Sequence, residues 1–248
     1  MGNETAAAGM VVTGHRLSPE IMQSLKEASA KTGVDFDFLV AQATAESGLR
    51  GDVRARQRHS SAAGLFQFNE QTWMEMVRQH GAKYGLGDVA ARITTLADGH
   101  LGTTDRALDN KILDLRKDVR LSAFFAGELA KHNATALQKA LHRKADAADL
   151  HVAHLLGTTG AIRFLRARDA DSAQSAAAIL PAAARQNPQL FFERGGDHTP
   201  KTVAAVYGKI KAKIETPLKQ LASSPASVTD GLRPGAGLTD ALPKKRGA

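Results

Sequence analysis

Residues 35–48 read DFDFLVAQATAESG, and this stretch decides the fold class. Asp35 can cap the start of a helix, and Gly48 can end it. Apolar residues recur between them at three- and four-residue steps, which is the spacing of one helix face: Phe36, Leu39, Val40 and Ala43. Glu46 continues that face, so a carboxyl group is expected at the rim of an apolar stripe. Desolvation there favours the uncharged acid, as general acid catalysis requires.

Similar patterns surround this helix. Ser18 and Pro19 open a helix that Gly33 ends, and Asn69 caps the helix of NEQTWMEMVRQH. Further helices are predicted over 86–98, 105–116, 118–132, 134–143, 146–156, 159–168, 171–186 and 201–222. Residues 51–68 lack a clear period and are predicted to form a long, shaped loop, with any β structure as a small hairpin near it. The fold class is therefore mainly α.

The amino-acid composition divides the chain into three parts. Residues 1–16 are small and polar and are predicted to be a flexible arm, whereas 17–220 should form one helical domain with a helical C-terminal extension. Residues 221–248 are rich in Ser, Pro and Gly and end in a basic cluster, so a disordered tail is expected there.

Net charge and composition narrow the range of possible partners and functions. The 248-residue chain has a formal net charge of +8, which favours an anionic partner such as nucleic acid, a membrane surface or an acidic wall polymer. Nucleic acid is the weaker choice, because aromatic and basic residues do not alternate in any stretch. Cysteine is absent. No signal peptide is expected at the amino terminus, and no apolar run reaches the roughly 18 residues of a membrane span.

Two motifs point to a particular chemistry. AESGL, residues 45–49, is followed by RHSSAAGLFQF, residues 58–68. This pair resembles the motifs of the soluble lytic transglycosylase family, which is related to goose-type lysozyme. In that family a Glu-Ser motif precedes a Ser-rich loop that runs into Gly-Leu-x-Gln. The resemblance covers about residues 18–168 and implies a lysozyme-like helical domain that acts on peptidoglycan.

The resemblance also implies roles for individual residues. Glu46 would be the catalytic acid/base, and Ser47 would pack or hydrogen-bond beside it. Ser60 and Ser61 would shape the approach loop. Gly64 would let the backbone come close to the sugar, and Gln67 would offer its amide to the substrate.

The family's third motif differs here. It usually reads Ala-Tyr-Asn-x-Gly, whereas residues 153–157 read AHLLG, so His154 stands in place of the tyrosine. This form resembles a phage-related and proteobacterial branch of the family. Two interpretations are open: His154 replaces the hydrogen bond of the tyrosine, or it is a core histidine.

Several alternatives stay open at this point. Glu46 could be a solvent-facing glutamate. His151 and His154 could ligate a metal, although no HExxH pattern supports this. Asp52 could be a second carboxylate that activates water. We expect neither a cofactor nor a metal.

The resemblance implies non-hydrolytic cleavage between N-acetylmuramic acid and N-acetylglucosamine by a monomer in the periplasm or at the cell wall. The alternatives are a hydrolytic muramidase and a wall-docking component of a secretion, flagellar or phage assembly.

Overall fold

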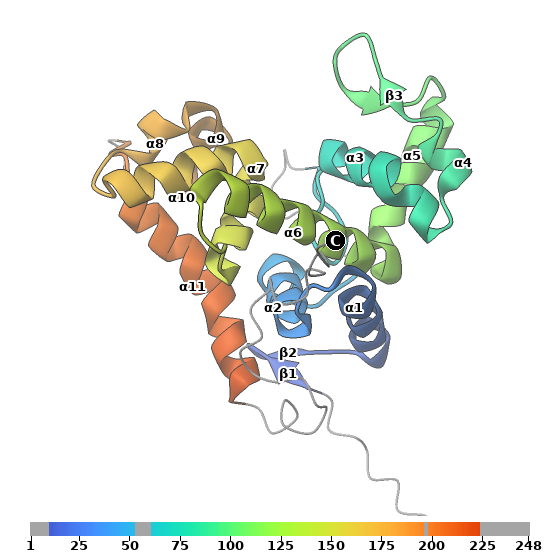
Figure 1. The fold of residues 1–248 in the computed structure, drawn as a ribbon, viewed down its shortest axis with the longest axis horizontal. Coiled ribbons are helices and arrows are strands. Elements are labelled where there is room, and N and C mark those ends of the chain that lie inside the picture. Colours follow the sequence, from blue (N-terminus) through green and yellow to red (C-terminus); the bar gives the residue numbers. More distant parts are fainter. Residues whose placement is uncertain (1–9, 53–60, 196–197, 224–248) are drawn as a thin grey trace, which may run out of the picture. The chain divides into compact units, whose positions relative to one another are not determined.

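The structure is a computed structural model in which residues 10–52, 61–195 and 198–223 are described. These residues are mainly helical, with two small antiparallel sheets of two strands each (Figure 1). The chain divides into two compact units. The first contains the described residues up to Glu128 and those from Gln220 on, and the second contains those within Leu129–Lys219. The sequence had indicated a single domain over 17–220.

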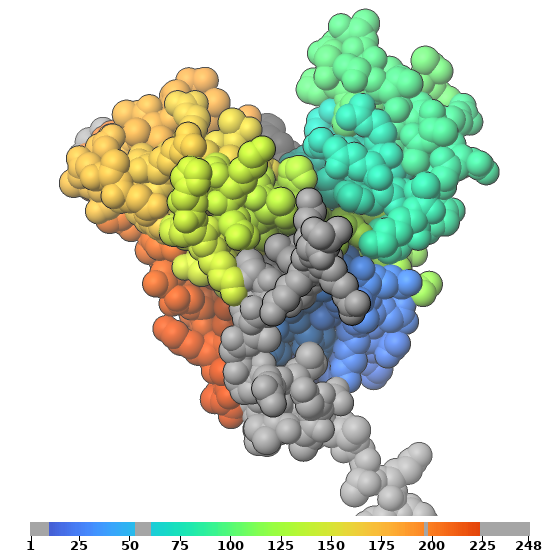
Figure 2. All heavy atoms as spheres, in the orientation of Figure 1, coloured from blue at the N-terminus to red at the C-terminus, as the bar shows by residue number. Residues whose placement is uncertain are grey.

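The first unit is built from short helices and two hairpins. Its helical segments are α1 (Pro19–Thr32), α2 (Phe36–Ser47), α3 (Glu70–His80), η1 (Gly81–Tyr84), α4 (Gly87–Ala90), α5 (Arg106–Asp114), η2 (Leu115–Lys117) and the start of α6 (Val119–Leu141). Its strands are β1 (Val11–Val12), β2 (His15–Arg16), β3 (Thr94–Thr95) and β4 (Leu101–Gly102). In the space-filling view, the segment from α3 to α5 forms one closely packed part of this unit (Figure 2).

The helix caps were predicted correctly. The side chain of Ser18 accepts a hydrogen bond from the backbone of α1, and Asp35 and Asn69 do the same for α2 and α3. Gly33 and Gly48 end α1 and α2 in the left-handed conformation that glycine adopts without strain. Local hydrogen bonding therefore sets the ends of α1 and α2.

The hairpins were not predicted where they occur. Val11–Arg16, which the sequence assigned to a flexible arm, forms the antiparallel pair β1–β2, and Val12 is buried. The predicted helix over 86–98 is wrong beyond α4, because Thr94 and Thr95 pair with Gly102 and Leu101. In the described part of 51–68, the β structure is an isolated bridge between Ala63 and Phe68.

An aromatic cluster forms much of the core of the first unit. The ring of Trp73 meets Phe68 and Phe125 edge to face, at centroid distances of 5.3 and 5.0 Å. Its indole nitrogen donates a 2.7 Å hydrogen bond to the carbonyl of Ile112. Buried Trp and its N–H partner therefore hold α3, α5 and α6 in one arrangement.

The second unit is also helical. It contains the rest of α6 and α7 (Ala147–Ala170), α8 (Ala176–Ile179), α9 (Pro181–Gln186), α10 (Pro188–Phe191) and most of α11 (Val203–Ala222). The two helices predicted over 118–143 are one continuous helix, α6. Gly157 has non-helical dihedral angles and divides α7, close to the predicted break between 146–156 and 159–168. The predicted tail begins at 221, but Leu221 and Ala222 belong to α11, and 224–248 lie outside the described residues.

Candidate active site

The candidate acid lies where a deeply buried helix reaches the surface. From Phe38 to Thr44 each residue of α2 is buried, and the most exposed of them, Thr44, has 7% of its surface accessible. Glu46, in the last turn, is half-buried. The sequence had indicated an apolar stripe on one side of α2. That stripe is buried, but the other side of the helix is buried as well, and Glu46 is the first charged residue after that segment.

The turn after Glu46 has a tightly defined backbone. Gly48 and Leu49 both have left-handed dihedral angles, with φ of 64° and 59°. For leucine this conformation costs roughly 1–2 kcal/mol, so it persists only where the surroundings fix it. Here Leu49 is 4% exposed, and the backbone N–H of Gly48 donates to the carbonyl of Thr44. Strained residues of this kind cluster at functional sites.

Ser47 stabilises this turn. Its hydroxyl donates to the carbonyl of Ala43 and accepts from the backbone N–H of Arg50, each at 3.1 Å. The side chain is buried, at 4% exposure. Ser47 therefore hydrogen-bonds beside Glu46 as expected, but in this structure almost none of its surface is accessible to a substrate.

His15 also contributes to this region, which was not predicted from the sequence. This residue of β2 lies directly over Gly48: a Cβ added there would come within 2.8 Å of its imidazole ring. The β1–β2 hairpin is thereby packed against the end of the helix that carries Glu46 (Figure 1). A histidine contact made by a two-residue strand leaves no periodic pattern in the sequence, so it could not have been found there.

The second motif forms a compact turn. Ala63 and Phe68 exchange backbone hydrogen bonds of 3.1 and 3.2 Å, which close the segment between them. Leu65 and Phe66 are fully buried within it. Apolar anchoring of this kind gives the loop one defined shape, as a binding loop requires.

Gly64 is needed for a close approach within the protein. Its φ is 78°, and a Cβ on it would overlap the carbonyl oxygen of Arg116 and lie 2.7 Å from the carbonyl carbon. The sequence assigned the close approach at Gly64 to a sugar. The structure corrects the reason, because the backbone of Arg116 occupies that position.

Gln67 has a fixed position in this turn. It is half-buried, its φ is 49°, and its side-chain amide donates a 3.0 Å hydrogen bond to the carbonyl of Gly64. Five non-glycine residues of the described chain have positive φ, and two of them, Leu49 and Gln67, fall in the two short motifs. Both motifs therefore have tightly constrained backbones.

Arg116 ties the loop to α5. Its guanidinium donates to the carbonyl oxygens of Ser61 and Phe68 at 2.6 and 3.3 Å, and to that of Leu113 at 2.8 Å. Ser61 is exposed. Ser60, the other predicted loop serine, lies outside the described residues. Asp52 is exposed in the turn after α2.

His154 belongs to the second unit, whereas the other described candidate residues belong to the first. It lies half-buried on α7, with its ring nearly parallel to that of His151 at 6.1 Å. His151 is fully buried. Burial, with the nearby His154 and Lys213 adding to it, lowers the pKa of His151 to about 3. The charged form of His151 is therefore strongly disfavoured.

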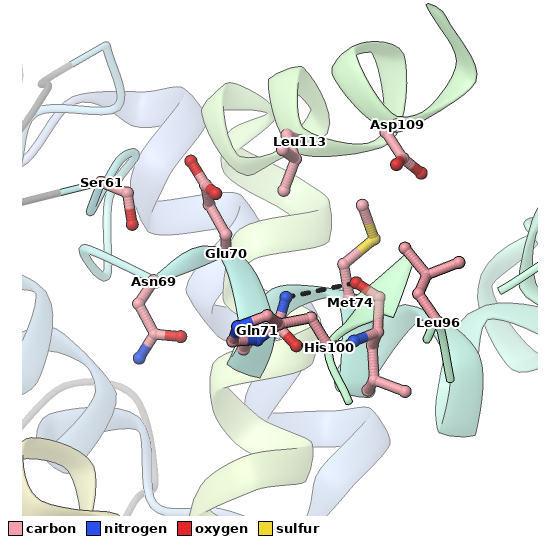
Figure 3. A pocket seen from close by; sticks show the side chains of 10 residues that line it. Ser61, Asn69, Glu70, Gln71, Met74, Leu96, His100, Asp109 and Leu113 are labelled. Atoms are coloured by element: carbon pink, nitrogen blue, oxygen red, sulfur yellow. Dashed lines mark hydrogen bonds between the residues drawn. The ribbon is translucent and has the colours of Figure 1, made fainter. Parts of the chain in front are cut away.

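A cavity of about 480 Å³ also lies in the first unit. The N-terminal turn of α3, the β3–β4 hairpin and α5 form its walls, and Ser61 lies at one side (Figure 3). The described residues that line it do not include Glu46.

Comparison with known protein families finds no family model that matches this chain. Within the described residues, no group of three or more His, Asp and Glu side chains is arranged to hold a metal ion. The helices in the described ranges include none that is both long and apolar enough to cross a membrane.

Proposed function

We propose that this protein is a peptidoglycan lytic transglycosylase that uses Glu46 as its catalytic acid/base. One observation carries the proposal: a half-buried carboxyl group ends a buried helix, and the turn beyond it has a constrained, partly strained backbone. A positioned general acid needs partial burial and rigid surroundings, and the burial of Glu46 and the constrained turn beside it support this role. The sequence motifs around Glu46 and Gln67 supply the substrate class.

One carboxyl group can carry both proton transfers. Protonated Glu46 donates to the glycosidic oxygen as the bond from C1 of N-acetylmuramic acid to that oxygen breaks, which releases the hydroxyl of N-acetylglucosamine. The carboxylate then accepts the proton of the muramic acid C6 hydroxyl while O6 bonds to C1. The product has a 1,6-anhydro end, no water is consumed, and Glu46 is protonated again.

The loop of the second motif would hold the sugar. Gln67 has a carbonyl and an amide suited to N-acetyl and hydroxyl groups, and its constrained backbone would fix their direction. Ser60 and Ser61 would line the approach. His154, in the second unit, keeps both interpretations that the sequence allows: a replacement for the hydrogen bond of the tyrosine in the usual third motif, or a core histidine. We assign Ser47 and Gly64 to support of the backbone, because their contacts are internal.

This activity would require the protein to act in the periplasm or at the cell wall, on glycan strands. A hydrolytic muramidase is the alternative enzyme, and it would need a second carboxylate to orient water. Asp52 is the nearest candidate along the chain. A wall-docking role in a secretion, flagellar or phage assembly is the alternative outside catalysis.

The direct test is the Glu46→Gln variant, which keeps the shape of the side chain and removes the acid. We expect a normal melting temperature and a loss of at least about a hundredfold in cleavage of purified peptidoglycan. Glu75→Gln on α3 is the matched control, since that exposed carboxylate bonds only to Gln79 among the described contacts. Equal activity of the two variants would refute the assignment.

A further inference from the structure

The cavity beside α3 combines aliphatic walls with acidic groups. Met74, Leu96 and Leu113 contribute the aliphatic surface. Glu70 lies on the same side of the cavity as Ser61, whereas Asp109 lies beyond Leu113, on the side of Leu96 (Figure 3). At about 480 Å³ the cavity falls in the size range of small-molecule sites.

The walls of this cavity are tied together by hydrogen bonds. The side-chain amide of Gln71 donates to the carbonyl of Leu101 and accepts from its N–H, at 3.2 and 2.7 Å, which docks the β3–β4 hairpin on α3. Asp109 accepts a 2.8 Å hydrogen bond from the backbone N–H of Thr103. The cavity is therefore formed before any ligand arrives, so little ordering is needed on binding.

The charge of the cavity is opposite in sign to that of the whole chain. Glu70 and Asp109 are acidic, and none of the described lining residues is Lys or Arg. His100, which also lines the cavity, is exposed. The chain as a whole carries +8. Two carboxylates in a cavity without a Lys or Arg side chain among its described lining residues disfavour an anionic ligand and favour a cationic one.

We propose that this cavity binds an aliphatic chain that carries a primary ammonium group. Met74, Leu96 and Leu113 would contact the methylene groups, and Glu70 and Asp109 would attract the ammonium. Two sources offer this chemistry: the side chain of a lysine-type residue in a peptide, and a free diamine. The proposal does not depend on the proposed glycan cleavage.

Titrations of the full-length protein, followed by NMR shifts or calorimetry, test this site. The probes are Nα-acetyl-lysine methylamide and 1,5-diaminopentane, and the neutral control is the Nε-acetylated lysine probe. We expect saturable binding of an amine probe, no saturation by the control, and weaker binding at higher salt. Tighter binding of the lysine probe would indicate a peptide ligand, and tighter binding of the diamine would indicate a free amine.

Substitutions of the two carboxylates test whether the amine binds in this cavity. Glu70→Gln and Asp109→Asn should each weaken amine binding at least about fivefold, because each removes one of the two negative charges that attract the ammonium. Glu20→Gln, in the first turn of α1, is the control for the loss of a carboxylate at a helix start. The Asn side chain keeps an acceptor for Thr103, and melting curves check folding.

Three results would overturn the proposal: no saturable binding, equal binding of the acetylated control, or unchanged binding in the Glu70→Gln/Asp109→Asn double variant. Glu46→Gln should bind the amine as wild type does. This site and the proposed catalysis can therefore fail independently.

Discussion

Gly64 lies so close to Arg116 that a side chain at position 64 would overlap the carbonyl oxygen of residue 116. The two residues are far apart in the sequence, and their approach joins the Gly-Leu-x-Gln turn to η2. The Arg116 guanidinium reinforces this junction through Ser61 and Phe68. The loop that would hold substrate is therefore fastened to the core of the first unit at its backbone.

Gly64→Ala should destabilise the protein by roughly 3 kcal/mol or more, because it adds a steric overlap to left-handed backbone strain. Gly99→Ala is the matched control. Gly99 has a similar φ of 83° but open space around it, so its substitution should cost about 1 kcal/mol. Urea unfolding measures both. Equal losses would show that the Gly64–Arg116 approach is not fixed.

Protonation of Glu128 in acid should lower the stability of the first unit. Its burial opposes ionisation, but the hydrogen bonds from Lys83 and Tyr84, at 2.5 and 2.6 Å, outweigh burial and hold its pKa below the ordinary value of 4.5. A lowered pKa stabilises the fold above about pH 4.5, and this contribution is lost as the pH falls through the folded-state pKa.

Glu128→Gln should therefore cost about 2 kcal/mol near neutral pH. The difference from wild type should shrink below about pH 4.5. Thermal melts from pH 7 to pH 3 test this dependence. A difference that stayed constant across the range would contradict it.

Burial of His151 should make the stability of the second unit sensitive to acid as well. Its pKa is lowered by burial from 6.5 to about 3, so the folded protein keeps it neutral while the unfolded chain takes up a proton below about pH 6.5. The contribution of the neutral His151 ring to the free energy of unfolding is therefore full above about pH 6.5 and decreases as the pH falls toward 3. NMR titration should find the His151 ring neutral at pH 5, and His151→Gln should reduce the pH dependence. A ring that titrated near pH 6.5 would disprove the lowered pKa.

Gln67→Ala should reduce peptidoglycan cleavage less than Glu46→Gln does, since it removes contacts and leaves the acid in place. Gln67→Gly distinguishes the role of the side chain from that of the backbone conformation, because glycine adopts the φ of 49° without strain. Both variants should lose activity to a similar degree if the amide contacts substrate. Recovery of activity in Gln67→Gly would assign the residue to backbone geometry alone.

The sequence was sufficient for the helix caps, which depend on neighbouring residues. Ser18, Asp35 and Asn69 accept hydrogen bonds from residues three positions on, and Gly48 ends α2 through its own conformation. These local relations also located Glu46 at the end of a buried helix. The helical period could not distinguish a helix with one buried face from one buried on almost every side, so the predicted stripe of α2 is buried as expected but the burial of its other side was missed.

The missed features depend on contacts between distant residues. The β1–β2 hairpin packs His15 on Gly48, and Gly64 meets Arg116, but neither pair leaves a pattern at one position that predicts the other. Thr94–Gly102 forms a hairpin because Gln71 binds the backbone of Leu101 and docks it, whereas the sequence over 86–98 indicated a helix.

The chemistry of the product tests the central claim most directly. Purified peptidoglycan is digested with the wild-type protein and with Asp52→Asn, and the fragments are weighed by mass spectrometry. We expect both proteins to release 1,6-anhydromuramic ends, which are lighter by one water than reducing ends, because one carboxyl group suffices for the proposed reaction. Reducing ends alone, lost in Asp52→Asn, would contradict the proposal and indicate a hydrolase, and no cleavage even with stem peptides present would indicate a docking protein.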